Sequence, residues 1–125
     1  MNRICINGRD ELIIIDLSKV AFFKADVDYT ILYFISGMTT TLPLNLARIE
    51  ALLIGVPKSK FCDFIRLGRS AIINQGYLFR IQTLHQKLIL SDGVKMINVT
   101  VSKDALKKYK QFIAQRYSPP RNSEV

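Results

Sequence analysis

Two arginines and a serine stand close together, directly ahead of a short apolar run. The segment is Phe64-Ile65-Arg66-Leu67-Gly68-Arg69-Ser70-Ala71-Ile72-Ile73-Asn74. This pattern predicts a polar loop that leads into a buried strand. Guanidinium groups held on a loop by a rigid sheet suit phosphate oxygens and the acceptors of guanine, and a serine hydroxyl adds a second kind of phosphate contact. The segment therefore indicates a site for a phosphate-bearing partner.

The charge of the whole chain agrees with an anionic partner. Lys and Arg number 18 against 10 acidic residues, which gives a net charge of +8 in 125 residues. Such an excess favours nucleic acid, although in many small proteins it serves only solubility. The placement of the basic residues must decide, and we expect one surface to be formed by those near loops and strand ends of the second half: Arg66, Arg69, Arg80, Lys87, Lys95 and Lys103.

Residues suited to catalysis or metal binding are sparse. His85 is the single histidine and has no carboxylate nearer in sequence than Asp92, so a surface imidazole is expected. Asp26 and Asp28 form the nearest carboxylate pair, but their spacing is ordinary for a turn. No glycine-rich phosphate loop, nucleophile elbow or metal-spaced histidine pair occurs. We expect no enzymatic activity, no metal and no cofactor.

The cysteines and the hydropathy of the chain indicate the cellular compartment in which the protein acts. Cys5 and Cys62 lie far apart in apolar surroundings without metal-ligand spacing, so both are predicted to be buried thiols. The first residues lack the apolar segment of a secretory signal, and no apolar run approaches the ~18 residues of a membrane span. A cytoplasmic protein without membrane contact is expected.

The elements that must position these side chains are mostly strands. Apolar alternation and turn residues predict strands at residues 4–6, 12–15, 20–25, 29–35, 38–43, 78–84, 86–90 and 95–101. A helical period with Asn45 as N-cap predicts a helix over 45–54, and Ser102 caps a final amphipathic helix over 103–113. The fold class is therefore mostly β, with antiparallel sheets, one mid-chain helix and one C-terminal helix.

The chain is long enough for one domain, which we place at residues 1–115. The proline-rich remainder, 116–125, is expected to be a disordered tail. No two helices are adjacent with a short turn between them, so a helix-turn-helix is not expected. If the protein recognises DNA, its loops must make the contacts.

In this order the elements resemble the LytTR family of bacterial DNA-binding domains, from about Ile4 to Ile113. The most specific match is to the family's Phe-x-Arg-x-His-Arg-Ser-x-x-Val-Asn, which spans Phe64 to Asn74 with Gly68 where histidine is usual. The other matches are a strand, polar turn and aromatic-led strand, a Leu-rich helix, and a closing turn, strand and helix start: Val20–Leu32, Leu46–Leu53, Ser91–Gly93 and Val101–Lys103.

The resemblance implies an elongated, mostly β fold whose loops enter successive major grooves of double-stranded DNA. It implies a transcriptional regulator that acts on direct-repeat promoter sites, often with DNA bending. Carried over by position, the DNA-binding residues are Tyr29, Arg66, Arg69, Ser70, Ser102 and Lys103. Lys103, where arginine is usual, lacks the bidentate fork that pairs with guanine, so we expect it to contact phosphate.

The resemblance leaves the wider arrangement open. The family's domain is commonly the output half of a response regulator, yet no receiver domain precedes Ile4, so the domain acts alone or belongs to something longer. A homodimer on DNA is also left open. Gly68 removes from the loop the side-chain donor that histidine supplies in the family pattern.

Two other functions compete with DNA binding. One is a β-rich protein- or ligand-binding module in which Phe22, Phe23 and Tyr33 line a pocket, although we favour the interpretation that these aromatics fill the core. The other is RNA binding, for which the exposed aromatic pair of a ribonucleoprotein-type surface is missing.

Overall fold

The computed structural model describes residues 2–117. It holds the two predicted helices and mostly antiparallel strands, so the predicted fold class is confirmed. The last helix continues through Tyr117, two residues into the segment predicted as a tail, and the rest of that segment lies outside the described residues.

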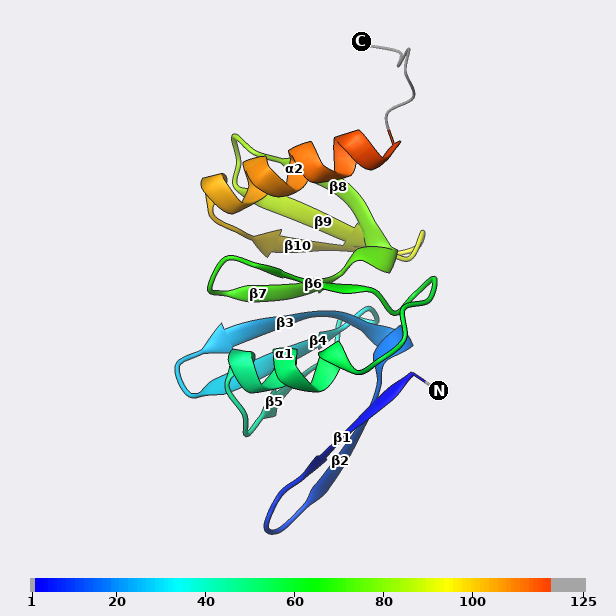
Figure 1. Ribbon diagram of the computed structural model, residues 1–125, viewed down its shortest axis with the longest axis vertical. Coiled ribbons are helices and arrows are strands. Elements are labelled where there is room, and N and C mark those ends of the chain that lie inside the picture. Colours follow the sequence, from blue (N-terminus) through cyan, green and yellow to red (C-terminus); the bar gives the residue numbers. More distant parts are fainter. Residues whose placement is uncertain (1, 118–125) are drawn as a thin grey trace.

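The strands form three antiparallel sheets that follow one another along the long axis (Figure 1). The first is a hairpin of two strands: β1 (Arg3–Asn7) and β2 (Leu12–Asp16). The second has the order β5-β4-β3-β7-β6: β3 (Val20–Asp26), β4 (Tyr29–Phe34), β5 (Thr39–Leu42), β6 (Phe64–Leu67) and β7 (Ala71–Asn74). The third has the order β10-β9-β8: β8 (Leu78–Gln82), β9 (Lys87–Ser91) and β10 (Met96–Thr100).

Two helices and two single 3-10 turns complete the chain. Helix α1 (Leu46–Ile54) lies against the five-stranded sheet, and α2 (Lys103–Tyr117) lies across the three-stranded sheet (Figure 1). The 3-10 turns η1 (Leu17–Lys19) and η2 (Gln75–Tyr77) lead into β3 and β8. Asn45 caps α1 through a hydrogen bond that its Oδ1 accepts from the Arg48 amide at 3.0 Å, as predicted.

The central strands β3 and β7 are buried on both faces. They pair with Phe22 opposite Ile73 and Phe23 opposite Ile72. Phe22 and Ile73 point into a core shared with the three-stranded sheet and α2, whereas Phe23 and Ile72 point into a core shared with the hairpin and α1. This two-sided burial explains why the Val20–Phe23 run is continuously apolar instead of alternating.

The aromatic residues that were candidates for a ligand pocket belong to these cores. Phe22 and Phe23 are buried, and the Phe22 ring stacks on Tyr33 with 4.2 Å between ring centroids. The adjoining hollow has a volume of about 90 Å³, smaller than the roughly 300 Å³ or more of ordinary ligand pockets. The interpretation that these rings fill the core is confirmed.

The two cysteines differ in their surroundings. Cys62 is buried, and this burial raises the pKa of its thiol. Cys5 is exposed, so the prediction of a buried thiol was wrong there. Its neighbours Ile4 and Ile6 point inward from β1, and the alternation of a strand therefore turns Cys5 to the outer face. No described helix is long and apolar enough to cross a membrane.

The side chain of Asn74, at the end of β7, links three segments of the backbone. It is fully buried, and its Nδ2 donates to the carbonyls of Val20 at 2.9 Å and Phe61 at 3.0 Å, with a longer contact of 3.4 Å to Leu17. Its Oδ1 accepts from the amides of Asp63 and Gly76. One carboxamide thus joins η1, the segment before β6, and η2.

A second set of polar contacts ties α2 to the same place. Gln75 accepts a hydrogen bond from the Tyr109 hydroxyl at 2.8 Å and donates to the Asp63 carboxylate at 3.2 Å. Burial raises the pKa of Tyr109, so this hydroxyl keeps the proton that it donates. The start of the three-stranded sheet and α2 are therefore held against the end of β7.

Replacing Asn74 tests how much this junction contributes to stability. Asn74→Ala removes both donors and leaves buried carbonyls unsatisfied, so we expect the free energy of unfolding to fall by about 3 kcal/mol or more. Urea unfolding followed by circular dichroism measures the change. Asn98→Ala, on the exposed face of β10, is the control and should stay within about 0.5 kcal/mol of the parent. Equal midpoints for the two variants would contradict this account.

Candidate nucleic-acid interface

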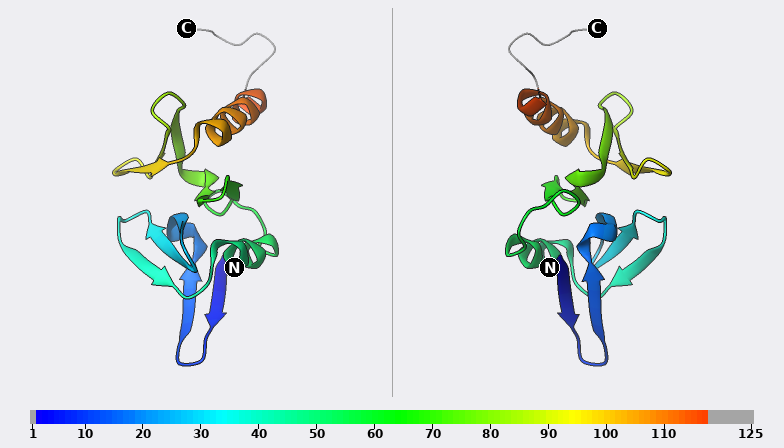
Figure 2. Two further views of the ribbon diagram at one scale, coloured as in Figure 1. Left: turned by 90° about the vertical axis from the view of Figure 1, so that its left-hand side faces the viewer. Right: turned by 90° about the vertical axis from the view of Figure 1, so that its right-hand side faces the viewer.

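Three connections that contain or adjoin predicted site residues lie on one long edge of the molecule. They are the β3–β4 turn, the β6–β7 turn and the β10–α2 junction, at the left of Figure 1 and facing the viewer in the left panel of Figure 2. Strands β3 and β6 are both antiparallel to β7, so they run in the same direction and end at the same edge. Strand β10 ends at this edge too, which brings the last junction beside the other two.

The β6–β7 connection is a tight hairpin. Phe64–Leu67 forms a strand instead of the predicted loop, because it pairs with β7 over its whole length, with Arg66 opposite Ile72. The turn itself is only Gly68-Arg69-Ser70. Gly68 has a φ of +63°, a conformation that glycine adopts without strain, and this requirement accounts for a glycine here. The predicted buried strand after the turn is confirmed, since Ile72 and Ile73 are both buried.

Arg66 is bound within the protein. Its Nη1 forms an ion pair with the Glu50 Oε1 of α1 at 3.0 Å. Its Nε donates to the Gly68 carbonyl at 3.1 Å, and its Nη2 donates to the Arg69 carbonyl at 3.3 Å. The planar guanidinium thus fixes the turn to α1, with three of its five donors in use.

Arg69 and Ser70 are exposed at the tip of the same turn. The Ser70 carbonyl accepts a hydrogen bond from the Ala25 amide at 2.9 Å, which extends the pairing between β3 and β7 to the last residue of the turn. Among residues 2–117, the ion pairs involve Lys58 and Arg66 but not Arg69. The Arg69 guanidinium is therefore a cation on a rigid support that faces solvent.

The β10–α2 junction lies against this turn. A Cβ added to Gly68 would be 3.8 Å from the Ala105 Cβ and 3.9 Å from the Ser102 Oγ. Ser102 caps α2 by accepting from the Ala105 amide at 3.4 Å, and Lys103 follows as an exposed first helical residue. The positive end of the α2 dipole thus adds to the charges of Lys103 and Arg69.

Tyr29 is the first residue of β4, directly after the third connection, and is 53% exposed. The exposed Asp26 and Asp28 flank it, and Val27 takes a φ of +56° at the tip of the turn. Two carboxylates disfavour a phosphate here, whereas carboxylate acceptors suit the amino group of a base. The chemistry of this turn therefore differs from that of the Arg69 turn.

A model of the LytTr DNA-binding domain family matches residues 10–114. The chain belongs to this family.

It is a DNA-binding domain of a kind that regulates transcription, and the resemblance seen in the sequence is confirmed. The fold is similar to that of the LytTr DNA-binding domain of a methyl-accepting/DNA response regulator from Bacillus cereus, with a TM-score of 0.59 at 24% identity over 90% of this chain and 97% of that one. No curated protein matches the chain significantly.

This LytTr domain has polar residues on the same edge that the sequence did not single out. Lys24, Asn98 and Thr100 line a small hollow together with Ser70, between the five-stranded and three-stranded sheets. Lys24 pairs with Ala71 directly beside the turn and is exposed. The signal available in the sequence was a lysine that interrupts the apolar run of β3.

The basic residues of the second half do not form the single surface that was predicted. Lys95 lies in the β9–β10 turn, at the opposite edge from Arg69, and its Nζ donates to the Ser36 carbonyl at 2.6 Å. Each five-residue strand separates the residues at its two ends, so sequence proximity to Lys103 did not bring Lys95 to the same edge. His85 lies exposed in the β8–β9 turn, and no group of three metal-ligating side chains occurs among the described residues.

The different roles of the two arginines are testable by stability alone. Arg66→Ala removes a half-buried ion pair and two turn contacts, so we expect the free energy of unfolding to fall by about 1 kcal/mol. Arg66→Lys should recover little of it, because an ammonium cannot make the forked set of contacts. Arg69→Ala should stay within about 0.5 kcal/mol of the parent. Urea unfolding gives all three values, and equal losses for Arg66→Ala and Arg69→Ala would refute the distinction.

Proposed function

We propose that this edge binds double-stranded DNA sequence-specifically and that the protein regulates transcription at direct-repeat promoter sites. The observation that carries the proposal is the alignment of the three connections on one edge, with the solvent-facing Arg69 beside the N-terminus of α2. Membership in a DNA-binding family supports DNA as the partner, and the net charge of +8 on the chain favours a negatively charged partner.

Each part of the edge has a distinct role in this proposal. Arg69 donates to guanine acceptors or to the phosphates that flank them, because its fork is free and rigidly presented. Ser102 and Lys103 hold a phosphate at the start of α2, where helix amides and a cation act together. Tyr29 contacts the DNA from the start of β4, beside the β3–β4 turn. Ser70 and Lys24 lie between Tyr29 and the start of α2 and contact the sugar-phosphate backbone of the DNA.

Arg66 has a supporting role. Its guanidinium is committed to Glu50 and to the carbonyls of Gly68 and Arg69, so it holds the turn in the conformation that presents Arg69. Side chains that fix a contact residue reduce the entropy lost on binding. Arg66 therefore contributes to affinity through Arg69 more than through its own contacts.

The proposal also covers the location of the protein in the cell, its role in a larger regulator and the number of copies on DNA. We assign the protein to the bacterial cytoplasm, with the domain serving as the output part of a response regulator and with two copies on adjacent repeats. The family supports this setting, and the elongated shape, with the connections spread along its length, suits a domain that spans more than one groove.

Arg69 is the first residue to test in binding. Arg69→Ala should weaken binding to a specific duplex by about 1 to 3 kcal/mol, with no loss of stability. The slope of log affinity against log salt concentration should fall by about the value of one phosphate contact or less. Fluorescence anisotropy over a series of salt concentrations measures both quantities. Lys95→Ala removes the same charge at the opposite edge and should change affinity little. Equal losses for the two variants would show that net charge, and not this edge, governs binding.

Site selection tests the remaining part of the proposal. Selection of bound sequences from a random duplex pool should yield a motif repeated in the same orientation, because an extended row of loops contacts successive grooves from one side. An inverted repeat would point to a two-fold symmetric dimer instead, and no enrichment at all would reject sequence-specific recognition.

A further inference from the structure

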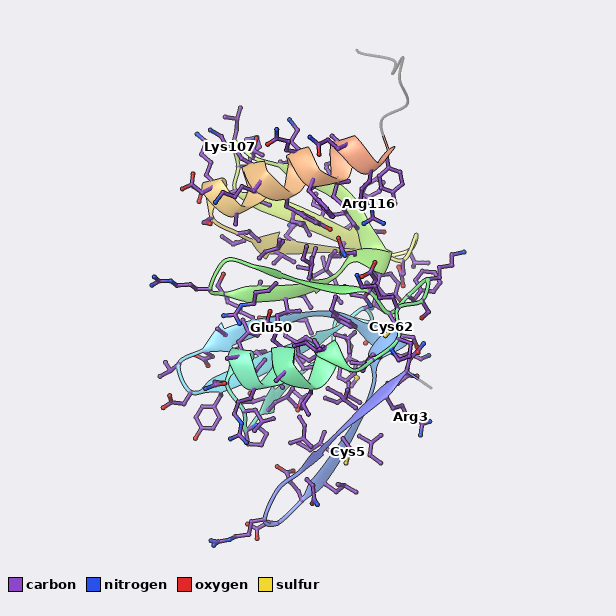
Figure 3. All side chains as sticks on the ribbon, in the orientation of Figure 1. Arg3, Cys5, Glu50, Cys62, Lys107 and Arg116 are labelled. Atoms are coloured by element: carbon purple, nitrogen blue, oxygen red, sulfur yellow. The ribbon has the colours of Figure 1, made fainter. Side chains whose placement is uncertain are left out.

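A hollow of about 510 Å³ lies on the opposite edge of the molecule from the Arg69 turn. It is bounded by the segment before β6, by the start of β8 and by the last turns of α2, and Figure 3 labels Arg116 on this side. Its lining combines cations, aromatic rings and backbone: Lys60, Gly76, Phe79, Ile113, Arg116 and Tyr117. None of the sequence motifs or the DNA-facing residues belongs to it.

Phe79 is turned out to solvent by a local irregularity of β8. Leu78 pairs with Leu90 and Arg80 pairs with Ile89, so Phe79 is an extra residue without a partner on β9. Such bulges redirect a side chain, and here the large apolar ring is 54% exposed. Tyr117, across the hollow on α2, is 77% exposed. Exposed aromatic residues beside arginine are typical of protein–protein contact sites.

Phe79, in the lining of the hollow, and Phe61, next to the lining residue Lys60, each have a cation beside the ring. The Arg80 guanidinium lies 5.5 Å from the Phe79 ring centroid, and the Lys60 ammonium lies 5.4 Å from that of Phe61. Arg116, which lines the hollow, lies 5.6 Å from the centroid of Phe112, a residue of α2 outside the lining. The one acidic residue in the lining, Asp63, is already engaged by Lys58 at 3.8 Å and by Gln75. The hollow therefore combines apolar surface with uncompensated positive charge.

The wall that carries Lys60 and Phe61 is rigidly held. A Cβ on Gly76 would lie 2.3 Å from the Lys60 carbonyl oxygen, so only glycine permits this close approach. The Phe61 carbonyl accepts from Asn74, and the Phe61 ring stacks on Tyr77 at 5.0 Å between centroids. The site exists before any partner arrives, which lowers the entropy lost on binding.

We infer that this hollow docks an acidic segment of a partner protein, one that places an aromatic or aliphatic side chain between Phe79 and Tyr117. Carboxylates of the segment pair with Lys60, Arg80 and Arg116, and its apolar side chain covers the exposed rings. Charge complementarity selects an acidic segment, and the hollow has room for a large side chain. The inference goes beyond DNA binding and does not depend on it.

A protein segment fits this surface better than single-stranded nucleic acid does. Single-stranded nucleic acid binds by stacking its bases on the free faces of aromatic rings. The Phe61 ring has Tyr77 stacked on one face and the Lys60 ammonium over the ring, and Phe79 has a guanidinium over it. Because these two rings already have partners, the surface suits the side chains of a protein better than a row of stacked bases.

The position of the hollow has a functional consequence. It faces away from the edge proposed for DNA, so both partners fit on one copy of the chain at the same time. A domain with this arrangement connects a DNA site to a second protein without a conformational change.

The test uses the full chain and two synthetic peptides. The first peptide alternates aspartate with phenylalanine and leucine, and the second has asparagine in place of aspartate. Nuclear magnetic resonance titration should show shifts for the first peptide confined to the hollow, around Phe79, Arg116 and Tyr117. The double variant Phe79→Ala/Arg116→Ala should weaken its binding by about tenfold or more.

A matched variant and a DNA measurement make the result decisive. Leu84→Ala/Lys107→Ala removes one exposed apolar residue and one cation elsewhere and should bind the acidic peptide as the parent does. The Phe79/Arg116 variant should keep its DNA affinity, and a preformed DNA complex should still bind the peptide. The inference is overturned if the acidic peptide fails to bind or the asparagine peptide binds equally well. It is also overturned if the two double variants lose the same affinity for the acidic peptide, or if a single-stranded oligonucleotide displaces this peptide from the hollow.

Discussion

The buried carboxamide of Asn74 is the interaction on which the arrangement of the molecule depends. An amide nitrogen has two hydrogens, and Asn74 directs them to the carbonyls of Val20 and Phe61, which belong to segments far apart in the chain. Its oxygen accepts from the amides of Asp63 and Gly76. An aspartate would lack the donors and a leucine would lack both functions, so only asparagine, or a residue of the same shape and polarity, satisfies all four groups.

Both proposed binding regions depend on this one side chain. Strand β7 runs from the Arg69 turn to Asn74, so the contacts of Asn74 hold one end of the strand that carries the turn at its other end. On the other edge, the contact with the Phe61 carbonyl holds the wall of the hollow against Gly76. Since β3 and β7 are buried on both faces, the free ends of the strands are the parts left for contact with partners.

Local signals made much of the fold predictable. Asn45 and Ser102 cap helices, and Asp92 accepts from the amides of Val94 and Lys95 in the predicted turn, because these contacts span only two or three residues. What the sequence could not show depends on distant partners. The pairing of β6 with β7 turned an expected loop into a strand, the outward side of Cys5 followed from which face of the hairpin meets the core, and Lys95 found its acceptor 59 residues away.

The two arginines of the turn show why residue type alone was insufficient to assign roles. If Arg66 left Glu50 to reach a phosphate, the Glu50 carboxylate would remain near the edge proposed for DNA without its counter-charge, and the Gly68 and Arg69 carbonyls would lose their donors. The gain from one phosphate contact would then be offset by repulsion and by the lost turn geometry. Arg69 has no such partners to give up, and its position depends on Arg66 staying in place. The proposed contact role of Arg69 therefore depends on Arg66 being held by Glu50. That ion pair joins β6 to α1 across 16 residues of the chain.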